Sequence, residues 1–98
     1  MSEITNPQDV ELEEIVLGAC LLESKAITLV ASILRPEVFY TETNRDIYAA
    51  LQSLYHAGQA IDIMTIKEEL ARRGKLESIG GLYTLVRISS RVVSSAHP

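Results

Sequence analysis

The chain has 98 residues, of which 47% are hydrophobic, and it carries a formal net charge of −4. This length favours one domain with a single core, and the acidic balance argues against a domain that mainly grips phosphates, because that task needs a dense basic face. A single cysteine excludes an internal disulfide, and no apolar run approaches the roughly 20 residues that cross a bilayer, so we expect a cytoplasmic domain with no membrane span.

The first predicted helix follows a polar stretch. Residues 1–8 lack the basic start and the apolar run of a signal peptide, and we expect them to form a flexible arm. Asp9 can cap the helix that follows, with Glu11 and Glu13 near its positive end. Gly18 lies in mid-helix, where glycine costs about 1 kcal/mol relative to alanine, so we expect another helix to cross close by. The apolar stripe of this helix consists of Leu12, Ile15, Val16, Ala19, Cys20 and Leu22.

A proline separates the second and third predicted helices. Ser24 can cap the second helix, and Pro36 ends it because proline disfavours helical backbone in the residue before it. Phe39 follows in a short turn as an aromatic core anchor, and a third helix begins near Thr41 or Thr43. The apolar stripe of the second helix consists of Ile27, Val30, Ile33 and Leu34.

Glycines mark the ends of the next two helices. Gly58 can end the third helix and Gly74 the fourth, each as a left-handed residue. Asp62 can cap the fourth helix, although Thr65 with Glu68 also fits a capping box one turn later. The start of the fourth helix is therefore open by one turn.

The last predicted helix opens at Gly80 and Gly81. The sequence becomes polar and serine-rich from Ser89 onward, which is typical of a linker. The residues expected to share the inward face of this helix are Leu82, Leu85, Val86 and Ser89. The chain is thus predicted to comprise a flexible arm at 1–8, a helical head at 9–91 and the start of a linker at 92–98.

No motif for catalysis, metal binding or cofactor binding is present. A phosphate-binding loop needs G-x-x-x-x-G-K-[ST], but Gly74-Lys75 is followed by Leu76, and Glu69 stands where the first glycine belongs. A structural zinc site needs four thiolate or imidazole ligands, and the chain has one cysteine and two histidines. We expect no catalytic residue, no metal and no cofactor in this chain.

Two groups of carboxylates and one thiol have a simpler interpretation than catalysis. We interpret the carboxylates as a solvated helix face with favourable end charges. Cys20 lies on an apolar stripe with no base beside it in the sequence, and we interpret it as a small core residue. The carboxylates that could be imagined as acid–base pairs are Glu11 with Glu13 and Glu14, and Glu68 with Glu69.

A series of short motifs lies along the chain between about Pro7 and Ser95. They are Val16-Leu17-Gly18 with Leu21-Leu22, Pro36-Glu37-Val38-Phe39-Tyr40, Ile47-Tyr48 with Leu54 and Gly58, Ile61-Asp62 with Thr65, Glu69-Leu70 and Gly74, and Leu76-Glu77 with Gly80-Gly81. No single motif is diagnostic, but the order and spacing of the set resemble the N-terminal domain of DnaB-type replicative DNA helicases. The resemblance implies an all-α fold, a small orthogonal bundle of five to six helices.

Two positions depart from the pattern of that family. Many members have a histidine where Asn44 stands. Many also have an aromatic residue three positions after the second glycine of the pair, where this chain has Thr84, and Tyr83 comes one residue earlier. A shift of one residue turns a helical side chain by about 100°, so a partner contact made by that aromatic residue would differ here.

The resemblance also implies a function without catalysis. DnaB-type helicases are ring hexamers that unwind DNA with ATP, and their N-terminal domains form a collar on which the C-terminal domain of primase docks. By resemblance, this chain would serve helicase self-association, as a dimer of heads and as a hexamer at full length, and primase docking. A helical hairpin and a RecA-like ATPase domain, with ATP and Mg, would follow beyond Pro98, and we expect little or no direct DNA binding by this part.

We expect the first helix and the start of the last helix to present the partner surface, because several of their polar and aromatic residues lie outside the apolar stripes. The residues proposed for this contact are Glu11, Glu14, Tyr83, Thr84 and Arg87.

Two other binding functions compete with this interpretation. A helix-turn-helix DNA-binding module would use Arg72, Arg73 and Lys75 on phosphate, but the acidic total and the lack of a polar base-reading stripe count against it. A helical adaptor from the primase side is the second, because the helicase-binding domain of primase is also a small helical bundle. The Gly80-Gly81 pair and the first helix favour the helicase side.

Overall fold

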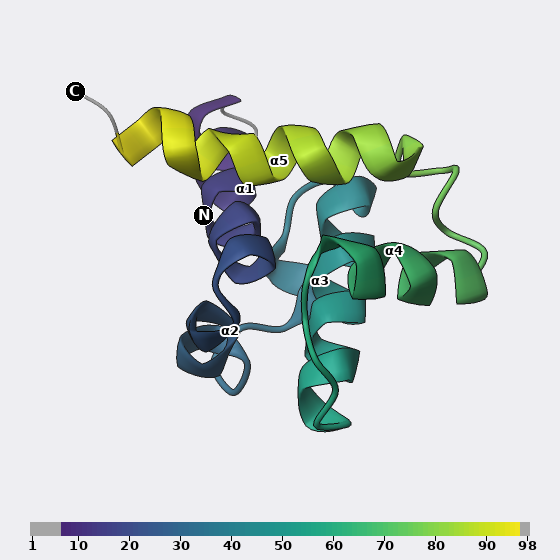
Figure 1. Ribbon diagram of the computed structural model, residues 1–98. Coiled ribbons are helices and arrows are strands. Elements are labelled where there is room, and N and C mark those ends of the chain that lie inside the picture. The colour runs from purple at the N-terminus through teal and green to yellow at the C-terminus, as the bar shows by residue number, and fades with distance from the viewer. Residues whose placement is uncertain (1–6, 97–98) are drawn as a thin grey trace.

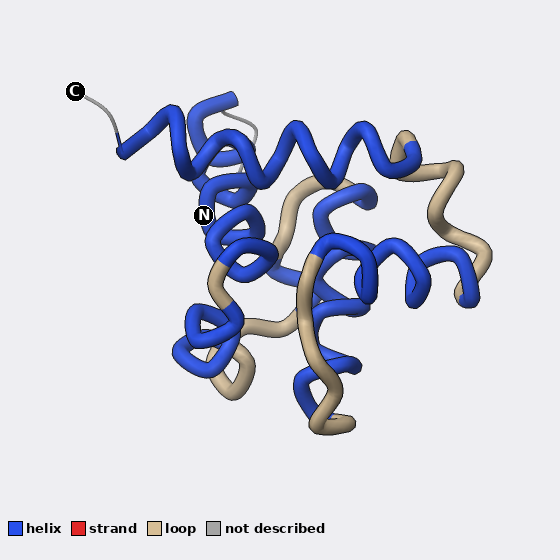
Figure 2. The backbone as a smooth tube through the Cα atoms, viewed as in Figure 1, coloured by secondary structure: helices blue, strands red, loops and turns tan. Residues whose placement is uncertain are grey.

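The computed structural model describes residues 7–96, and the regular secondary structure of that range is entirely helical (Figures 1 and 2), which confirms the all-α prediction. None of the helices in that range combines the length and the apolar composition needed to span a membrane. In chain order the elements are α1 (Pro7–Leu22), α2 (Ser24–Val30), the 3₁₀-helix η1 (Pro36–Val38), α3 (Glu42–His56), α4 (Ile63–Arg72) and α5 (Gly81–Ala96).

Helix α1 is the centre of the bundle, because it packs against each of the other four α-helices. Helix α5 crosses α1 on one side of the molecule, and α2 lies at the opposite end, where it contacts α1 and α3 but neither α4 nor α5 (Figure 1). The described core is lined by Leu17, Cys20, Leu21, Ile27, Ala31, Phe39, Ile47, Tyr48, Ala50, Leu51, Ile66, Leu70, Ile79, Leu85 and Ile88.

Two aromatic residues hold the loop between α2 and α3 on the core. Phe39 stacks on Tyr48 with the ring centroids 4.9 Å apart, and the Tyr48 hydroxyl donates to the carbonyl oxygens of Val30 (3.2 Å) and Leu34 (2.9 Å). A buried tyrosine normally needs such a partner for its hydroxyl. Phe39 is thus the core anchor that the sequence predicts.

Local capping interactions set the starts of α3 and α4. The Thr41 hydroxyl caps α3 by accepting a hydrogen bond from the backbone N–H of Asn44. Asp62 caps α4 by accepting from the Thr65 amide, and the Thr65 hydroxyl accepts in turn from the Asp62 amide, so the two residues form a reciprocal box. The earlier of the two predicted starts for α4 is therefore the observed one. The glycines with positive φ are Gly58, Gly74, Gly80 and Gly81.

The predicted starts of the first two helices are wrong by three residues and by one residue. Helix α1 begins at Pro7, so Asp9 lies in its first turn and is not its cap. Proline is common at the first helical position because the N–H that it lacks would have no partner there. Helix α2 begins at Ser24 itself, with Glu23 at the cap position, and no side chain caps it. Of the arm predicted at 1–8, residues 1–6 lie outside the described range.

The predicted end of the last helix is also wrong. Helix α5 continues to Ala96, so the linker expected to begin at residue 92 is helical as far as the structure describes it, and residues 97–98 lie outside the described range. Ser89 and Ser90 do not interrupt the helix, because both hydroxyls donate back to the carbonyl oxygen of Val86. Helix α2, by contrast, ends at Val30, well before Pro36.

The buried faces of α1 and α5 are turned relative to the predicted stripes. In α1 the core is reached by Leu17, Cys20 and Leu21, and in α5 by Leu85 and Ile88. Because α1 and α5 bury each other along one narrow seam, apolar residues beside that seam stay in solvent. The residues of these two helices that were predicted to point inward and are exposed are Leu12, Leu22, Leu82 and Val86. Ile33, from the stripe predicted for the second helix, is also exposed.

Candidate partner-binding surface

The seam between α1 and α5 is closed by a glycine. A Cβ atom added to Gly18 would lie 2.5 Å from the carbonyl oxygen of Ile88 and 3.0 Å from Cγ2 of Val92. Only glycine therefore lets the two backbones approach this closely. The helix expected to cross α1 at Gly18 is α5.

Charged residues hold the same seam. Glu14 of α1 accepts from Nε of Arg91 (2.5 Å) and from Nη1 of Arg87 (3.1 Å), both on α5. Burial alone would raise the pKa of Glu14, but the hydrogen bonds and positive charges of Arg91 and Arg87 outweigh it and hold the pKa below its ordinary value of 4.5. Glu14 is thus a charged clamp that fixes α5 on α1.

The structure divides the five residues proposed for partner contact. Glu11 and Tyr83 are exposed, Tyr83 with 74% of its surface in solvent, and Arg87 is partly exposed while it holds Glu14. Glu14 and Thr84 are only 8% and 7% exposed, so their prediction as free contact residues is wrong. Glu14 faces α5 in the seam, and the Thr84 hydroxyl packs on Gly80 in the turn just before α5.

Glu11 and Tyr83 lie near different ends of α5. Glu11 lies close enough to Arg91 to raise the pKa of that guanidinium through its charge, after the larger effect of Glu14. Arg91 follows Tyr83 by eight residues, which is about 12 Å along a helix. The two residues therefore bracket α5 and do not form one contact point.

The sequence pattern wrongly assigned two exposed apolar residues at the start of α5, Leu82 and Val86, to the core, whereas Tyr83 was predicted to contact a partner. Leu82, Tyr83 and Val86 all point to solvent on the first two turns of α5. We call these three residues the α5 face. Spacing alone does not separate the two sides of α5, because Leu82, Val86 and Ser89 follow helical spacing as well as Leu85, Ile88 and Ser89 do.

A second apolar surface lies between α1 and the loop that contains η1. Its lining residues enclose about 200 Å³. Leu12 and Val38 stand exposed at its rim, and Phe39 is buried in the core beneath it. We call it the α1–η1 groove, and its lining consists of Leu12, Glu13, Val16, Leu34, Val38 and Phe39.

Glu13 closes one side of this groove. Its carboxylate accepts from the Tyr40 amide (2.9 and 3.1 Å) and from Nδ2 of Asn44 (3.0 Å), which ties the start of α3 to α1. Asn44 is buried, and its Oδ1 has no hydrogen-bond partner among the described residues. Asn44 is therefore a structural contact of Glu13.

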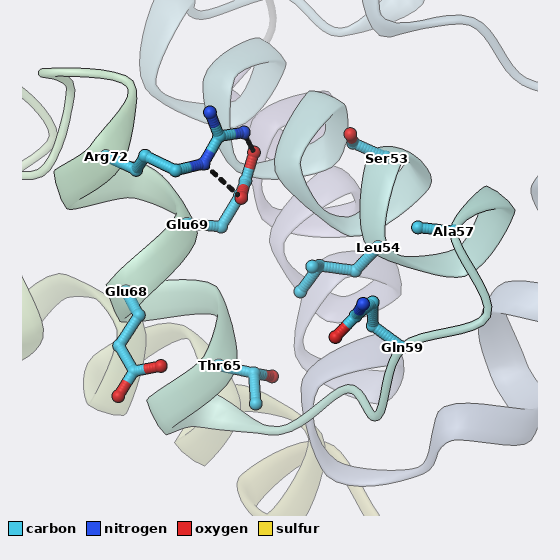
Figure 3. A pocket seen from close by; sticks show the side chains of 8 residues that line it. All are labelled: Ser53, Leu54, Ala57, Gln59, Thr65, Glu68, Glu69 and Arg72. Carbon is cyan, nitrogen blue, oxygen red and sulfur yellow. Dashed lines mark hydrogen bonds and ion pairs between the residues drawn. The ribbon is translucent and has the colours of Figure 1, made fainter.

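The pocket between α3 and α4 carries a neutralised carboxylate (Figure 3). Glu69 accepts from Arg72 (2.6 and 3.1 Å), as the dashed lines show, and from Arg73 (2.7 Å). The hydrogen bonds from Arg72 and Arg73 lower the pKa of Glu69. The pocket encloses about 420 Å³ and is lined by Ser53, Leu54, Ala57, Gln59, Thr65, Glu68, Glu69 and Arg72.

The ion pairs of Glu69 contradict two interpretations made from the sequence. Glu69, like Glu14, is a buried member of an ion pair and not part of a solvated face. A carboxylate held ionised by two guanidinium groups is also a poor general acid. Arg72 and Arg73, the residues that a DNA-binding module would place on phosphate, are both bound to Glu69.

The described residues also offer no arrangement for metal or thiol chemistry. Within them, no group of three or more His, Cys, Asp or Glu side chains is placed to hold a metal ion. Cys20 is buried in the core, and burial raises the pKa of its thiol to about 11. A thiol with that pKa is almost entirely protonated at neutral pH and is a weak nucleophile.

Comparison with known proteins identifies the family to which this fold belongs. Residues 5–98 match the family model described as DnaB-like helicase N terminal domain. The crystal structure of the N-terminal domain of DnaB helicase from Mycobacterium tuberculosis superposes with a TM-score of 0.84 at 41% identity, over 90% of this chain and 61% of that one.

Curated relatives are replicative helicases that are much longer than this chain. The chain is 42% identical over 91 residues to the replicative DNA helicase DnaB of Rhodothermus marinus and 37% identical over 91 residues to the replicative DNA helicase DnaC of Bacillus subtilis (strain 168). These matches cover 93% of this chain but only 10% and 20% of the two relatives.

Proposed function

The chain belongs to the DnaB-like helicase N-terminal domain family, and from that premise we propose that it is a collar domain of a replicative DNA helicase that supports self-association and docks primase. Unwinding and ATP hydrolysis would be performed by other parts of the helicase, with ATP and Mg bound there. The contribution of this chain would be binding and positioning, which raises the local concentration of primase beside the ring.

The observation that carries the docking proposal is the α5 face. Leu82, Tyr83 and Val86 form an exposed apolar strip on a helix that Glu14 and Gly18 hold rigidly against α1. Exposed apolar patches with a polar border mark interaction sites on soluble proteins, and tyrosine is enriched among the residues that dominate binding energy. A rigid support also lowers the entropy lost when a partner binds.

Calorimetric titration of the chain with the C-terminal domain of its cognate primase tests this proposal. We expect saturable binding, and we expect Tyr83→Ala combined with Leu82→Ala to weaken it at least tenfold, which corresponds to about 1.4 kcal/mol. The helix content in circular dichroism should stay the same, because both side chains are exposed.

A matched control replaces Met64 and Glu68, two exposed residues of α4, with alanine. This variant should bind primase as the unmodified chain does. Equal affinity for the α5-face variant and the α4 variant would remove the α5 face from the proposal. A folded chain that shows no heat of binding would remove primase docking by this domain.

A further inference from the structure

Two adjacent serines in the middle of α5 donate to the same backbone carbonyl group. The Ser89 hydroxyl donates to the carbonyl oxygen of Val86 at 2.8 Å, and the Ser90 hydroxyl donates to the same oxygen at 2.9 Å. In a regular α-helix that oxygen also accepts the backbone N–H of the residue four positions later, which is Ser90 itself. Serine hydroxyls that bond back to helix carbonyls weaken the backbone ladder and bend helices. Residues 86–90 are therefore a turn at which α5 bends easily.

The parts of α5 before and after this turn are held in different ways. Residues 81–88 place Leu85 and Ile88 in the core, where both side chains are completely buried. Residues 91–96 reach past the α1 ribbon in Figure 1. Their described contacts are with α1: Val92 is half-buried beside Gly18, and Arg91 binds the Glu14 carboxylate. The core thus fixes the first part of α5, and α1 holds the second.

Glu14 connects the two parts across the serine turn. Arg87 precedes the serines and Arg91 follows them, one helical turn later, and both donate to the same oxygen of Glu14, Oε1. Charge-assisted hydrogen bonds of this kind are about twice as strong as those between neutral groups. Because Glu14 belongs to α1, its bond to Arg91 keeps residues 91–96 in line with the part of α5 that the core holds.

We propose that α5 has a hinge at Ser89 and Ser90 and that the bond between Glu14 and Arg91 is the latch that keeps this hinge closed. With the latch bound, α5 is the continuous helix of the structure. When Arg91 leaves Glu14, residues 91–96 turn away from α1 while the core retains the first part. The α5 face precedes the hinge and keeps its position.

The latch opens without leaving a buried charge unpaired. Glu14 keeps its bond to Arg87 when Arg91 leaves, so the main cost of opening a buried ion pair does not arise. The side chain of Arg91 is 38% exposed, which lets an acidic side chain of a partner compete with Glu14 for it. In a collar domain the latch would set the direction in which the chain leaves the head. That consequence rests on the proposed function, whereas the hinge itself does not.

Distances between pairs of spin labels, measured by double electron–electron resonance, test the hinge. One pair is attached through Glu42→Cys and Ala96→Cys and reports on the end of α5. A second pair, through Glu42→Cys and Tyr83→Cys, reports on its start. The Cys20 thiol is buried and does not take up the label. Glu14→Gln should raise the share of a second distance between positions 42 and 96 about tenfold, because a hydrogen bond to a charged group changes an equilibrium by at least that factor. The distance between positions 42 and 83 should stay single.

Matched variants separate the latch from general loosening of the seam. Arg91→Gln removes the bond beyond the serines and should act as Glu14→Gln does. Arg87→Gln leaves Arg91 on Glu14 and should keep one distance between positions 42 and 96. Ser89→Ala combined with Ser90→Ala, added to Glu14→Gln, should restore the single distance, because alanine removes both hydroxyls and has the higher helix propensity.

Three results would each overturn the inference. They are a single distance between positions 42 and 96 in both Glu14→Gln and Arg91→Gln, a second distance that appears equally at position 83, and a second distance that persists after both serines are replaced. Titration with primase tests the proposed function separately. Primase binding by a chain whose α5 never bends would remove the hinge alone, and a hinge in a chain that does not bind primase would remove docking alone.

Discussion

Gly18 of α1 lies directly against the carbonyl group of Ile88 in α5, so the two helices cross with main chain facing main chain. The buried side chains of α5 around this crossing are Leu85, Ile88 and Ser89. The orientation of α5, and with it that of the α5 face, depends on the absence of one side chain.

Gly18→Ala should destabilise the fold. Alanine gains about 1 kcal/mol of helix propensity over glycine, but its Cβ would contact the main chain of Ile88 and the side chain of Val92, which requires α1 and α5 to separate. We expect a net loss of about 1–2 kcal/mol in the free energy of unfolding, measured with urea. A stability equal to or above that of the unmodified chain would contradict the close crossing.

A companion substitution separates packing from backbone conformation. Gly74 has φ = +73° and open space where a Cβ would stand, so Gly74→Ala should cost about 1 kcal/mol through backbone strain alone. It should leave α1 and α5 in place, with unchanged protection of the α5 amides against hydrogen exchange, whereas Gly18→Ala should reduce the protection around Ile88.

The Glu14 clamp predicts a pH dependence of stability. The folded-state pKa of Glu14 lies below its ordinary value of 4.5, so the folded chain binds this proton more weakly than the unfolded chain. The stabilisation is therefore present above pH 4.5 and is lost as the pH falls through the folded-state pKa. Glu14→Gln should lower the free energy of unfolding by about 1 kcal/mol at pH 7, and the difference from the unmodified chain should shrink below pH 4.5.

Glu68→Gln is the control for that experiment, because Glu68 is exposed and has no ion-pair partner among the described residues. Its stability should follow that of the unmodified chain at every pH. A constant difference between Glu14→Gln and the unmodified chain from pH 7 to pH 3 would show that Glu14 acts through packing and not through its charge.

Glu13→Ala should loosen the corner between η1 and α3. The Tyr40 amide loses its acceptor, and Asn44, already without a partner for Oδ1, loses the partner of its Nδ2 as well. Hydrogen bonds to charged groups contribute about 1.5–3 kcal/mol, so we expect hydrogen exchange at the Tyr40 amide to accelerate at least tenfold. Glu42→Ala, at an exposed position of the same corner, should leave that rate unchanged.

Cys20 should resist thiol reagents in the folded chain. Burial raises the pKa of its thiol to about 11 and also blocks access. We expect no reaction with a disulfide reagent at pH 8 over hours and stoichiometric reaction in denaturant. Rapid labelling under native conditions would mean that the core opens at α1 far more often than the packing suggests.

The features that sequence predicted well are those set by neighbouring residues. Asp62 caps α4 as predicted, because a capping interaction involves only residues within one turn of the chain. Phe39 anchors the loop as predicted, because a large apolar side chain in a short turn packs on the core. The order of the short motifs also sufficed to predict the family, since these motifs mark helix ends and close crossings.

The features that sequence did not predict depend on residues far along the chain. Glu14 is buried because Arg87 and Arg91 reach it from α5, more than 70 residues later, and nothing around Glu14 in the sequence signals this pairing. The exposure of Leu82 and Val86 depends on which side of α5 meets α1. Apolar spacing identifies a helix, but on a helix with apolar residues on two sides it does not choose the buried one.

Two consecutive carboxylates of α1 bind two different parts of the domain. Glu13 binds the corner at Tyr40 and Asn44 beside the groove, and Glu14 binds Arg87 and Arg91 on α5. Adjacent helical residues project about 100° apart, so α1 cannot rotate about its own axis without straining both sets of bonds together. A partner that bound α5 and rotated α1 about its axis would therefore change the shape of the α1–η1 groove. Rotation of α1 would thus couple the α5 face to the α1–η1 groove.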